Sequence, residues 1–340
     1  MERRSFIKLG GASLASAVLG SGLLSWVPRS EAATISKTFY ITGGTLTMPD
    51  GVGVYFKGFS NSATGLNVPA ASIICQEGDT LSITVVNKLA VTHNFVIGGL
   101  KAGDPPLAST GDILSGASKT LTYTIPTGKA GSYLFYDNKT SYNVFLGLHG
   151  GLAIMPAGKS NQLYSGSPTF VKQQFWIFND IDPALNSAVQ RNTVVPTTFT
   201  PRYFTINGLT SLPPGAVGHG DPTRDALYDT RTRLAGFVGD RTLVRMLSAG
   251  MCSHAVHAHG NHFEWLTDRG TVRSSVWKKD TLYLRNKLGK IDAIFPFEAP
   301  PDAYPPTTHG HFPMHLHDEM SQTAGGGMYQ FGSMTEIEFL

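Results

Sequence analysis

Eight of the chain's eleven histidines fall into two short segments of its second half. The first segment has the pattern His-x-x-His-x-His-x-x-His over residues 254–262, and the second has His-x-His-x-x-x-His-x-His over residues 309–317. Neutral imidazole is a borderline-soft ligand that suits copper and zinc. Packing several such rings together without a metal would leave buried polar groups without partners, so these segments predict a metal site.

Several of these histidines are spaced two residues apart, which is the period at which side chains share one face of a β-strand. Side chains alternate along a strand, so two histidines separated by one residue project to the same side. His257 and His259 form one such pair, and His315 and His317 form another. Two strands lying side by side would present all four rings to a shared ion, and we expect this arrangement.

Strands of the required kind recur along the chain. Apolar runs with a period of two stand between turns at 81–86, 121–125 and 282–284, and no long amphipathic helix competes with them. The composition, with 38 Gly, 20 Pro and 10% aromatic residues, fits a globular protein of many short strands. The predicted fold class is all-β.

The two halves of the chain repeat one plan. In each half a Gly-Asp pair opens a strand that leads to a histidine, at 78–93 and again at 239–254, and 131–136 matches 310–315. A turn-rich linker at 156–169 separates the halves. We therefore expect two β-sandwich domains in tandem, at residues 34–158 and 168–340.

The first 32 residues have the pattern of an export signal. Arg3-Arg4 precedes Phe-Ile-Lys, a mildly apolar stretch runs from Leu9 to Trp26, and small residues at 30–33 offer a cleavage site. This pattern is typical of a Tat signal. A permanent membrane anchor is the alternative, but the stretch is only weakly hydrophobic. We expect residues 1–32 to be removed from a periplasmic or otherwise exported protein that does not insert into the membrane afterwards.

Charge argues against nucleic acid as a partner. Removal of residues 1–32 takes away four basic and two acidic residues, so the formal net charge falls from +3 to +1. No basic face then remains for nucleic acid or a membrane surface. The two cysteines, Cys75 and Cys252, lie in different halves. In an oxidising compartment they could pair, or they could be two unrelated thiols.

The histidine motifs resemble those of a known family. His-x-x-His-x-His-Gly at 254–260, followed by His-x-His at 315–317, is similar to the two copper motifs in the last domain of multicopper oxidases (laccases and their relatives). The resemblance implies cupredoxin-like Greek-key sandwiches with copper as the cofactor. The two-domain length and the export signal are similar to those of two-domain laccases and copper nitrite reductases. Those proteins assemble as trimers, so the resemblance implies a homo-oligomer, and specifically a trimer. From the residues alone, four imidazoles would accept zinc as well.

Carried over position by position, the resemblance makes His254 a blue-copper ligand. It makes the four paired histidines the second domain's half of a trinuclear copper cluster. However, Leu316 stands where the family has its blue-copper cysteine, and Ser321 stands where it has the next histidine. A blue-copper site needs a thiolate. Met320 and Met328 would make only a weak site, so we expect the electron-entry copper to be absent.

The first half departs further from the family pattern. His93 lies in a segment that resembles the copper-ligand segment of simple cupredoxins, but Val96, Gly98 and the Tyr-Asp-Asn at 136–138 replace the family's other histidines. We therefore interpret His93, and also His149, as structural residues. In a trimer, Tyr136 or Asp137 of a neighbouring copy could complete the site of the second domain.

Three functions remain, and a conventional laccase is not among them. The first is a copper-dependent oxidoreductase with altered chemistry, acting on a small molecule or a metal ion. The second is a periplasmic copper buffer or delivery protein, and the third is a non-catalytic exported scaffold. Methionines in the second half either favour the second function or fill the core: Met246, Met251, Met314, Met320, Met328 and Met334. Asp318 and Glu319 are either acceptors for ring N–H groups or surface carboxylates.

Overall fold

The computed structural model describes residues 23–24, 29–159, 161–212, 215–216, 218–301, 303, 305–318 and 332–340. Of the predicted export signal, only residues 23–24 and 29–32 are therefore described, and Glu319, Met320, Ser321 and Met328 lie outside the described residues. Within the described ranges, strands dominate and the single α-helix is α1 (Pro183–Gln190), which Asp182 caps through the backbone N–H groups of Ala184 and Leu185. The all-β prediction is confirmed.

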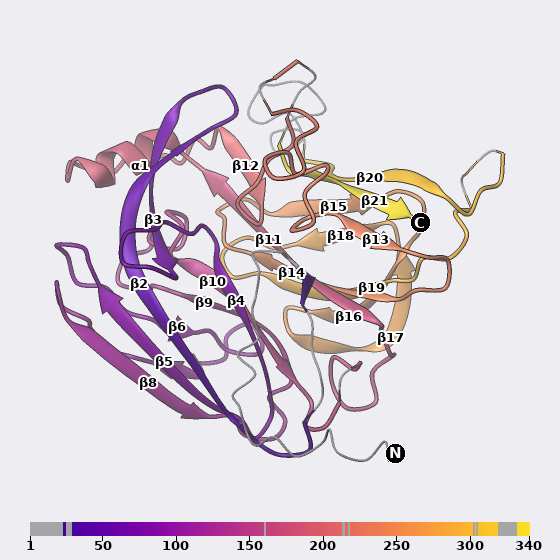
Figure 1. The fold of residues 1–340 in the computed structure, drawn as a ribbon, viewed down its shortest axis with the longest axis horizontal. Coiled ribbons are helices and arrows are strands. Elements are labelled where there is room, and N and C mark those ends of the chain that lie inside the picture. Colours follow the sequence, from indigo (N-terminus) through magenta and orange to yellow (C-terminus); the bar gives the residue numbers. More distant parts are fainter. Residues whose placement is uncertain are drawn as a thin grey trace, which may run out of the picture.

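The first sandwich packs two sheets face to face (Figure 1, indigo to magenta). Its four-stranded sheet has the order β3 (Gly53–Ser60), β2 (Thr34–Thr47), β5 (Thr80–Asn87), β8 (Ser118–Thr124). Its five-stranded sheet has the order β4 (Ala70–Gln76), β10 (His149–Met155), β9 (Gly131–Tyr136), β6 (Val96–Ile97), β7 (Ala108–Ser109). Four phenylalanine rings lie in contact between the sheets: Phe39, Phe59, Phe95 and Phe135.

The second sandwich carries the histidine motifs, on β15 and β20. It is drawn mainly in pink, orange and yellow in Figure 1. Its larger sheet has the order β1 (Leu23–Leu24), β11 (Lys172–Ile181), β14 (Thr242–Ser248), β19 (Lys290–Phe295), β16 (Phe263–Asp268), β17 (Thr271–Lys279), and β12 (Tyr203–Ile206) also pairs with β11. Its smaller sheet has the order β13 (Leu234–Gly236), β21 (Met334–Phe339), β20 (Gly310–Leu316), β15 (His254–Ala258), β18 (Thr281–Leu284).

The two sandwiches share one topology, as the matched segments of the sequence predict. Strands β2, β5 and β8 pair parallel and then antiparallel, and β11, β14 and β19 do the same. The series β4-β10-β9-β6-β7 corresponds in pairing and order to β13-β21-β20-β15-β18. The second sandwich adds the hairpin β16–β17 at the edge of its larger sheet. Strand β9 of the first half thus corresponds to β20, which carries His315.

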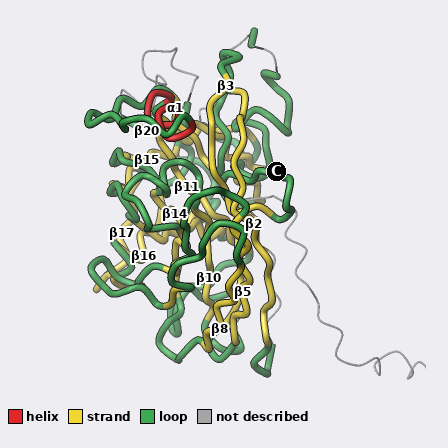
Figure 2. Tube along the Cα trace, turned by 90° about the vertical axis from the view of Figure 1, so that its left-hand side faces the viewer, coloured by secondary structure: helices red, strands yellow, loops and turns green. Residues whose placement is uncertain are grey.

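A buried seam joins the sandwiches side by side (Figure 2). Apolar side chains of β9 and β10 pack there against those of β11 and β14. Arg245, which is fully buried, donates from Nη1 to Ser132 Oγ at 2.8 Å and from Nη2 to Gln173 Oε1 at 2.8 Å, so a charged hydrogen-bond network crosses the seam. Cys75 is buried in the first sandwich and Cys252 is half-buried in the second, and the two are not bonded.

Candidate metal centre

Strands β15 and β20 lie side by side and bring the two histidine motifs together. They pair antiparallel, with His257 directly opposite His315. Apolar residues alternate with histidines along both strands. Val256 and Ala258 of β15 and Leu316 of β20 are buried in the core of the second sandwich. The residues between them must then project to the opposite face of the sheet. Directly opposite positions place side chains within contact distance.

Four imidazole rings gather on that face. Ring centroids lie 4.6 Å apart for His257 and His259, 5.3 Å for His257 and His315, and 5.3 Å for His259 and His315. The ring of His317 lies 4.3 Å from that of His257 and 5.2 Å from that of His315. His259 and His317 are exposed, so the cluster opens to solvent on one side.

Three of the four rings offer nitrogens to one point. One ring nitrogen each of His257, His259 and His315 lies within 4.8 Å of the others, and His259 Nε2 is 3.2 Å from His315 Nε2. A metal–nitrogen bond of about 2.0–2.1 Å in a tetrahedral set separates two nitrogens by about 3.3 Å. The donor set therefore fits a copper-sized ion after small ring movements. His317 packs against this group without being part of it.

The protonation of these rings favours metal binding. Burial lowers the pKa of His315 to about 4, and repulsion from the neighbouring histidines acts in the same direction. Burial and repulsion from His259 and His317 also lower the pKa of His257. A neutral imidazole is the form that ligates metals. The two rings are therefore in the ligating form at neutral pH.

A polar contact on the outer side orients His257. Its Nδ1 lies 3.0 Å from Thr281 Oγ1 and 3.6 Å from an oxygen of Asp280, because β18 pairs with β15 so that Thr281 stands opposite His257. This contact engages Nδ1 and leaves Nε2 available to bind a metal. Histidines that ligate metals commonly have such a partner on their other ring nitrogen. No sequence pattern points to Asp280 or Thr281, because their role depends on the register of a third strand.

Known proteins match both the sequence and the fold. A sequence model of the multicopper oxidase family matches residues 56–159. The crystal structure of blue copper oxidase from Nitrosomonas europaea matches at TM-score 0.66 and 20% identity, over 90% of this chain and 86% of that one. Copper nitrite reductase from the same organism matches at TM-score 0.60 and 15% identity, over 90% and 94%. The chain therefore has the cupredoxin fold of these copper proteins, and it is similar in sequence to multicopper oxidases over residues 56–159.

A multicopper oxidase from Campylobacter jejuni, described as a metallo-oxidase, matches at TM-score 0.57 and 18% identity, over 89% of this chain and 57% of that one. A search of curated protein sequences found no match. The family model falls on the first sandwich, whereas the histidine cluster lies in the second.

His254 lies on the other face of β15, apart from the cluster. It is buried beside the ring of Phe178, its Nε2 lies 3.0 Å from Asp180 Oδ1, and its Nδ1 lies 3.4 Å from Asp318 Oδ2. Burial alone would lower the pKa of His254, but the two carboxylates raise it to about 9. A protonated ring offers no lone pair to a metal. Asp318 also accepts a hydrogen bond from the backbone N–H of Ala255, so its carboxylate contacts the His254 side of β15 rather than the histidine cluster.

The first sandwich holds its histidines in internal hydrogen bonds. His93 Nδ1 lies 2.6 Å from Asp137 Oδ2, and both side chains are fully buried. The other oxygen of Asp137 accepts from Asn143 Nδ2 at 2.8 Å. His149 Nδ1 lies 2.7 Å from the carbonyl oxygen of Val144, and burial lowers the pKa of His149 to about 4. These contacts agree with structural roles for both histidines.

The described methionines of the second sandwich are mostly packing residues. Met246 and Met314 are fully buried in its core, Met334 is 8% exposed, and Met251 packs against the apolar seam.

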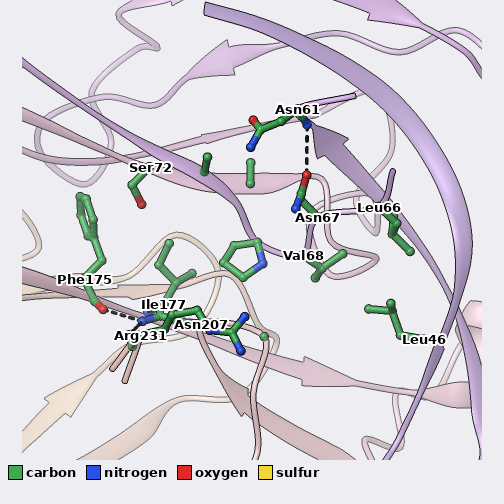
Figure 3. Close-up of a pocket in the computed structure, with 14 residues that line it drawn as sticks. Leu46, Asn61, Leu66, Asn67, Val68, Ser72, Phe175, Ile177, Asn207 and Arg231 are labelled. Carbon is green, nitrogen blue, oxygen red and sulfur yellow. Dashed lines mark hydrogen bonds between the residues drawn. The ribbon is translucent and has the colours of Figure 1, made fainter. Parts of the chain in front are cut away.

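A cavity of about 350 Å³ lies between the two sandwiches, away from the histidine cluster, and none of the clustered histidines lines it (Figure 3). Its labelled polar groups are Asn61, Asn67, Ser72, Asn207 and Arg231.

Proposed function

We propose that this protein is an exported copper-binding oxidoreductase with one non-blue copper site, formed by His257, His259 and His315 with His317 beside them. The convergence of three ring nitrogens within 4.8 Å carries the proposal. Copper is preferred over zinc because the matching family and structures are named as copper proteins, and they lend zinc no support. A bound copper would supply one-electron chemistry to a small substrate at the open side of the cluster.

The residues of the chain would have distinct roles at that site. His259 and His315 would hold the ion through Nε2, since these atoms are 3.2 Å apart. Thr281 and Asp280 would hold the ring of His257 through its Nδ1. Exposed His317 would border the open side, where a small molecule or a metal ion could approach. The metallo-oxidase description of the Campylobacter jejuni match supports a metal ion as one class of substrate.

The absence of a blue copper is part of the proposal. Leu316 is fully buried among apolar side chains, and His254 is bound to two carboxylates. Neither residue offers the thiolate or the free nitrogen that a blue site requires. Electrons would therefore enter at the histidine cluster itself. This distinguishes the protein from a conventional laccase.

We also propose that the protein assembles as a homotrimer. Both carboxylate oxygens of Asp137 already accept hydrogen bonds inside their own sandwich. Asp137 of a neighbouring copy is therefore a poor additional ligand, and the half-buried Tyr136 is the better candidate. Light scattering of the purified protein measures this assembly directly.

A copper buffer or delivery protein is the second candidate, because the cluster is exposed and open. The described methionines give it little support, since Met246 and Met314 lie in the core. Metal analysis and oxidation assays of the copper-loaded protein separate the candidates. We expect one copper per chain, a type-2 EPR spectrum without intense blue absorption, and oxidation of a phenol or a cuprous ion. Copper binding without turnover would support the buffer, and no copper would leave only the scaffold.

A further inference from the structure

In each sandwich, the aspartate of a Gly-Asp turn binds a group at the start of the first long strand. In the second sandwich, Asp240 Oδ2 lies 3.2 Å from the ammonium of Lys172, the first residue of β11. In the first sandwich, Asp79 accepts the backbone N–H of Ala33, just before β2, at 2.8 Å and also binds the guanidinium of Arg29. The repeated plan therefore places a cation against this aspartate in both sandwiches.

Asp79 depends on its cation more than Asp240 does. The Asp79 side chain is 0% exposed, whereas that of Asp240 is 25% exposed. A buried carboxylate without a positive partner is strongly destabilising. Among the described residues, Arg29 supplies the only side-chain cation bonded to Asp79, and Gln76 adds a backbone N–H at 2.9 Å. Removal of residues 1–32 would take Arg29 away.

We propose that Asp79 binds the new amino terminus created when residues 1–32 are removed. Hydrolysis of the Ala32–Ala33 peptide bond consumes one water, leaves a carboxylate on Ala32 and converts the Ala33 nitrogen into an ammonium. That nitrogen already lies 2.8 Å from Asp79 Oδ1, so the ammonium replaces Arg29 as the cation. Ser30, Glu31 and Ala32 are exposed, which leaves the bond open to a peptidase. The inference rests on the proposed export and not on copper binding.

Few other charged groups act at this position. The buried thiol of Cys75 lies nearby, and burial, followed by the charge of Asp79, raises its pKa well above the ordinary value. Glu77, two residues earlier, is occupied by the backbone N–H groups of residues 128–130. The Ala33 ammonium would therefore be the group near Asp79 that titrates close to neutral pH, with an ordinary pKa of about 7.7–8.0.

The test compares two forms of the chain that begins at Ala33, which retains β2 to β21: one with a free amine and one with that amine acetylated. Acetylation keeps an N–H donor but removes the charge. An ion pair raises the pKa of the amine, so its stabilisation is present below pH 7.7 and is lost as the pH rises through the raised value. We expect the free-amine form to melt roughly 2–4 °C higher at pH 6, and the difference to disappear well above the raised pKa.

Two controls decide the outcome. Asp79→Asn should abolish the difference between the two forms, whereas Asp240→Asn should leave it unchanged. If Asp79→Asn does not fold, the pH dependence of the unsubstituted pair still tests the charge. Equal melting temperatures at pH 6, or an exported protein whose mass shows a first residue other than Ala33, would overturn the inference. Neither result would bear on the histidine cluster.

Discussion

The contact between Thr281 and His257 offers a sharp test, because removing one hydroxyl changes the site without changing its ligands. Thr281→Val keeps the shape and the β-branch of the residue but removes the oxygen that lies 3.0 Å from His257 Nδ1. On the same side, the Asp280 carboxylate lies 3.6 Å from Nδ1, beyond hydrogen-bond range, while the backbone carbonyl of Asp280 is a further acceptor for the ring. The ring of His257 would therefore lose its hydroxyl contact while its Nε2 remains.

The expected cost follows from similar outer contacts in metal sites. Loss of such a partner typically weakens metal binding 10–100-fold, which corresponds to about 1.4–2.8 kcal/mol. Copper affinity would be measured by competition with a chelator of known affinity. The matched control is Thr84→Val, which removes an exposed hydroxyl that bonds Thr120 in the first sandwich. We expect the control to bind copper like the unsubstituted chain.

A double substitution tests whether Thr281 acts through His257. In a His257→Ala background, Thr281→Val should have no further effect on copper affinity, because the ring that it orients is gone. Unchanged affinity in the single Thr281→Val variant would contradict the reasoning. So would equal additional losses in the two backgrounds, since Thr281 would then act on the site by another route.

Other predictions address the core, the seam and export. Leu316→Ala should lower the free energy of unfolding in urea by about 2–5 kcal/mol, while copper binding is retained, because this side chain is fully buried and faces away from the rings. Burial lowers the pKa of Lys290 to about 8, so this residue should make the protein more stable as pH rises from 8 to about 10.4. Lys290→Met should flatten that slope in denaturant titrations, and an unchanged slope would refute the assignment. Arg4→Lys should retain the protein in the cytoplasm of a Tat-competent cell, as measured by fractionation.

Local patterns predicted the parts of the site that depend on strand alternation. The His-x-His spacing was enough to expect His257 and His259 on one face of their strand, and His315 and His317 on one face of theirs, because alternation is a property of each strand alone. That β15 and β20 are neighbours was expected because only adjacent strands would present all four rings to one ion, and their pairing confirms it. The ring of His317 lies just past the end of β20, where alternation no longer fixes direction, and it packs beside the three-nitrogen group.

The parts that sequence could not supply depend on contacts between distant strands. Asp180, the partner of His254, stands on β11, 74 residues earlier, and no local pattern links the two. The separation of Cys75 and Cys252 depends on how the sandwiches pack, so both alternatives were open in the sequence. The orienting role of Thr281 likewise depends on the register of β18 against β15.

Anomalous diffraction at the copper edge from copper-soaked crystals tests copper binding at the histidine cluster most directly. We expect one strong peak about 2.0–2.1 Å from ring nitrogens of His257, His259 and His315, and its loss in His315→Ala but not in His262→Ala. A copper peak at His254 or at His93, or no peak at the cluster in a folded protein, would contradict it.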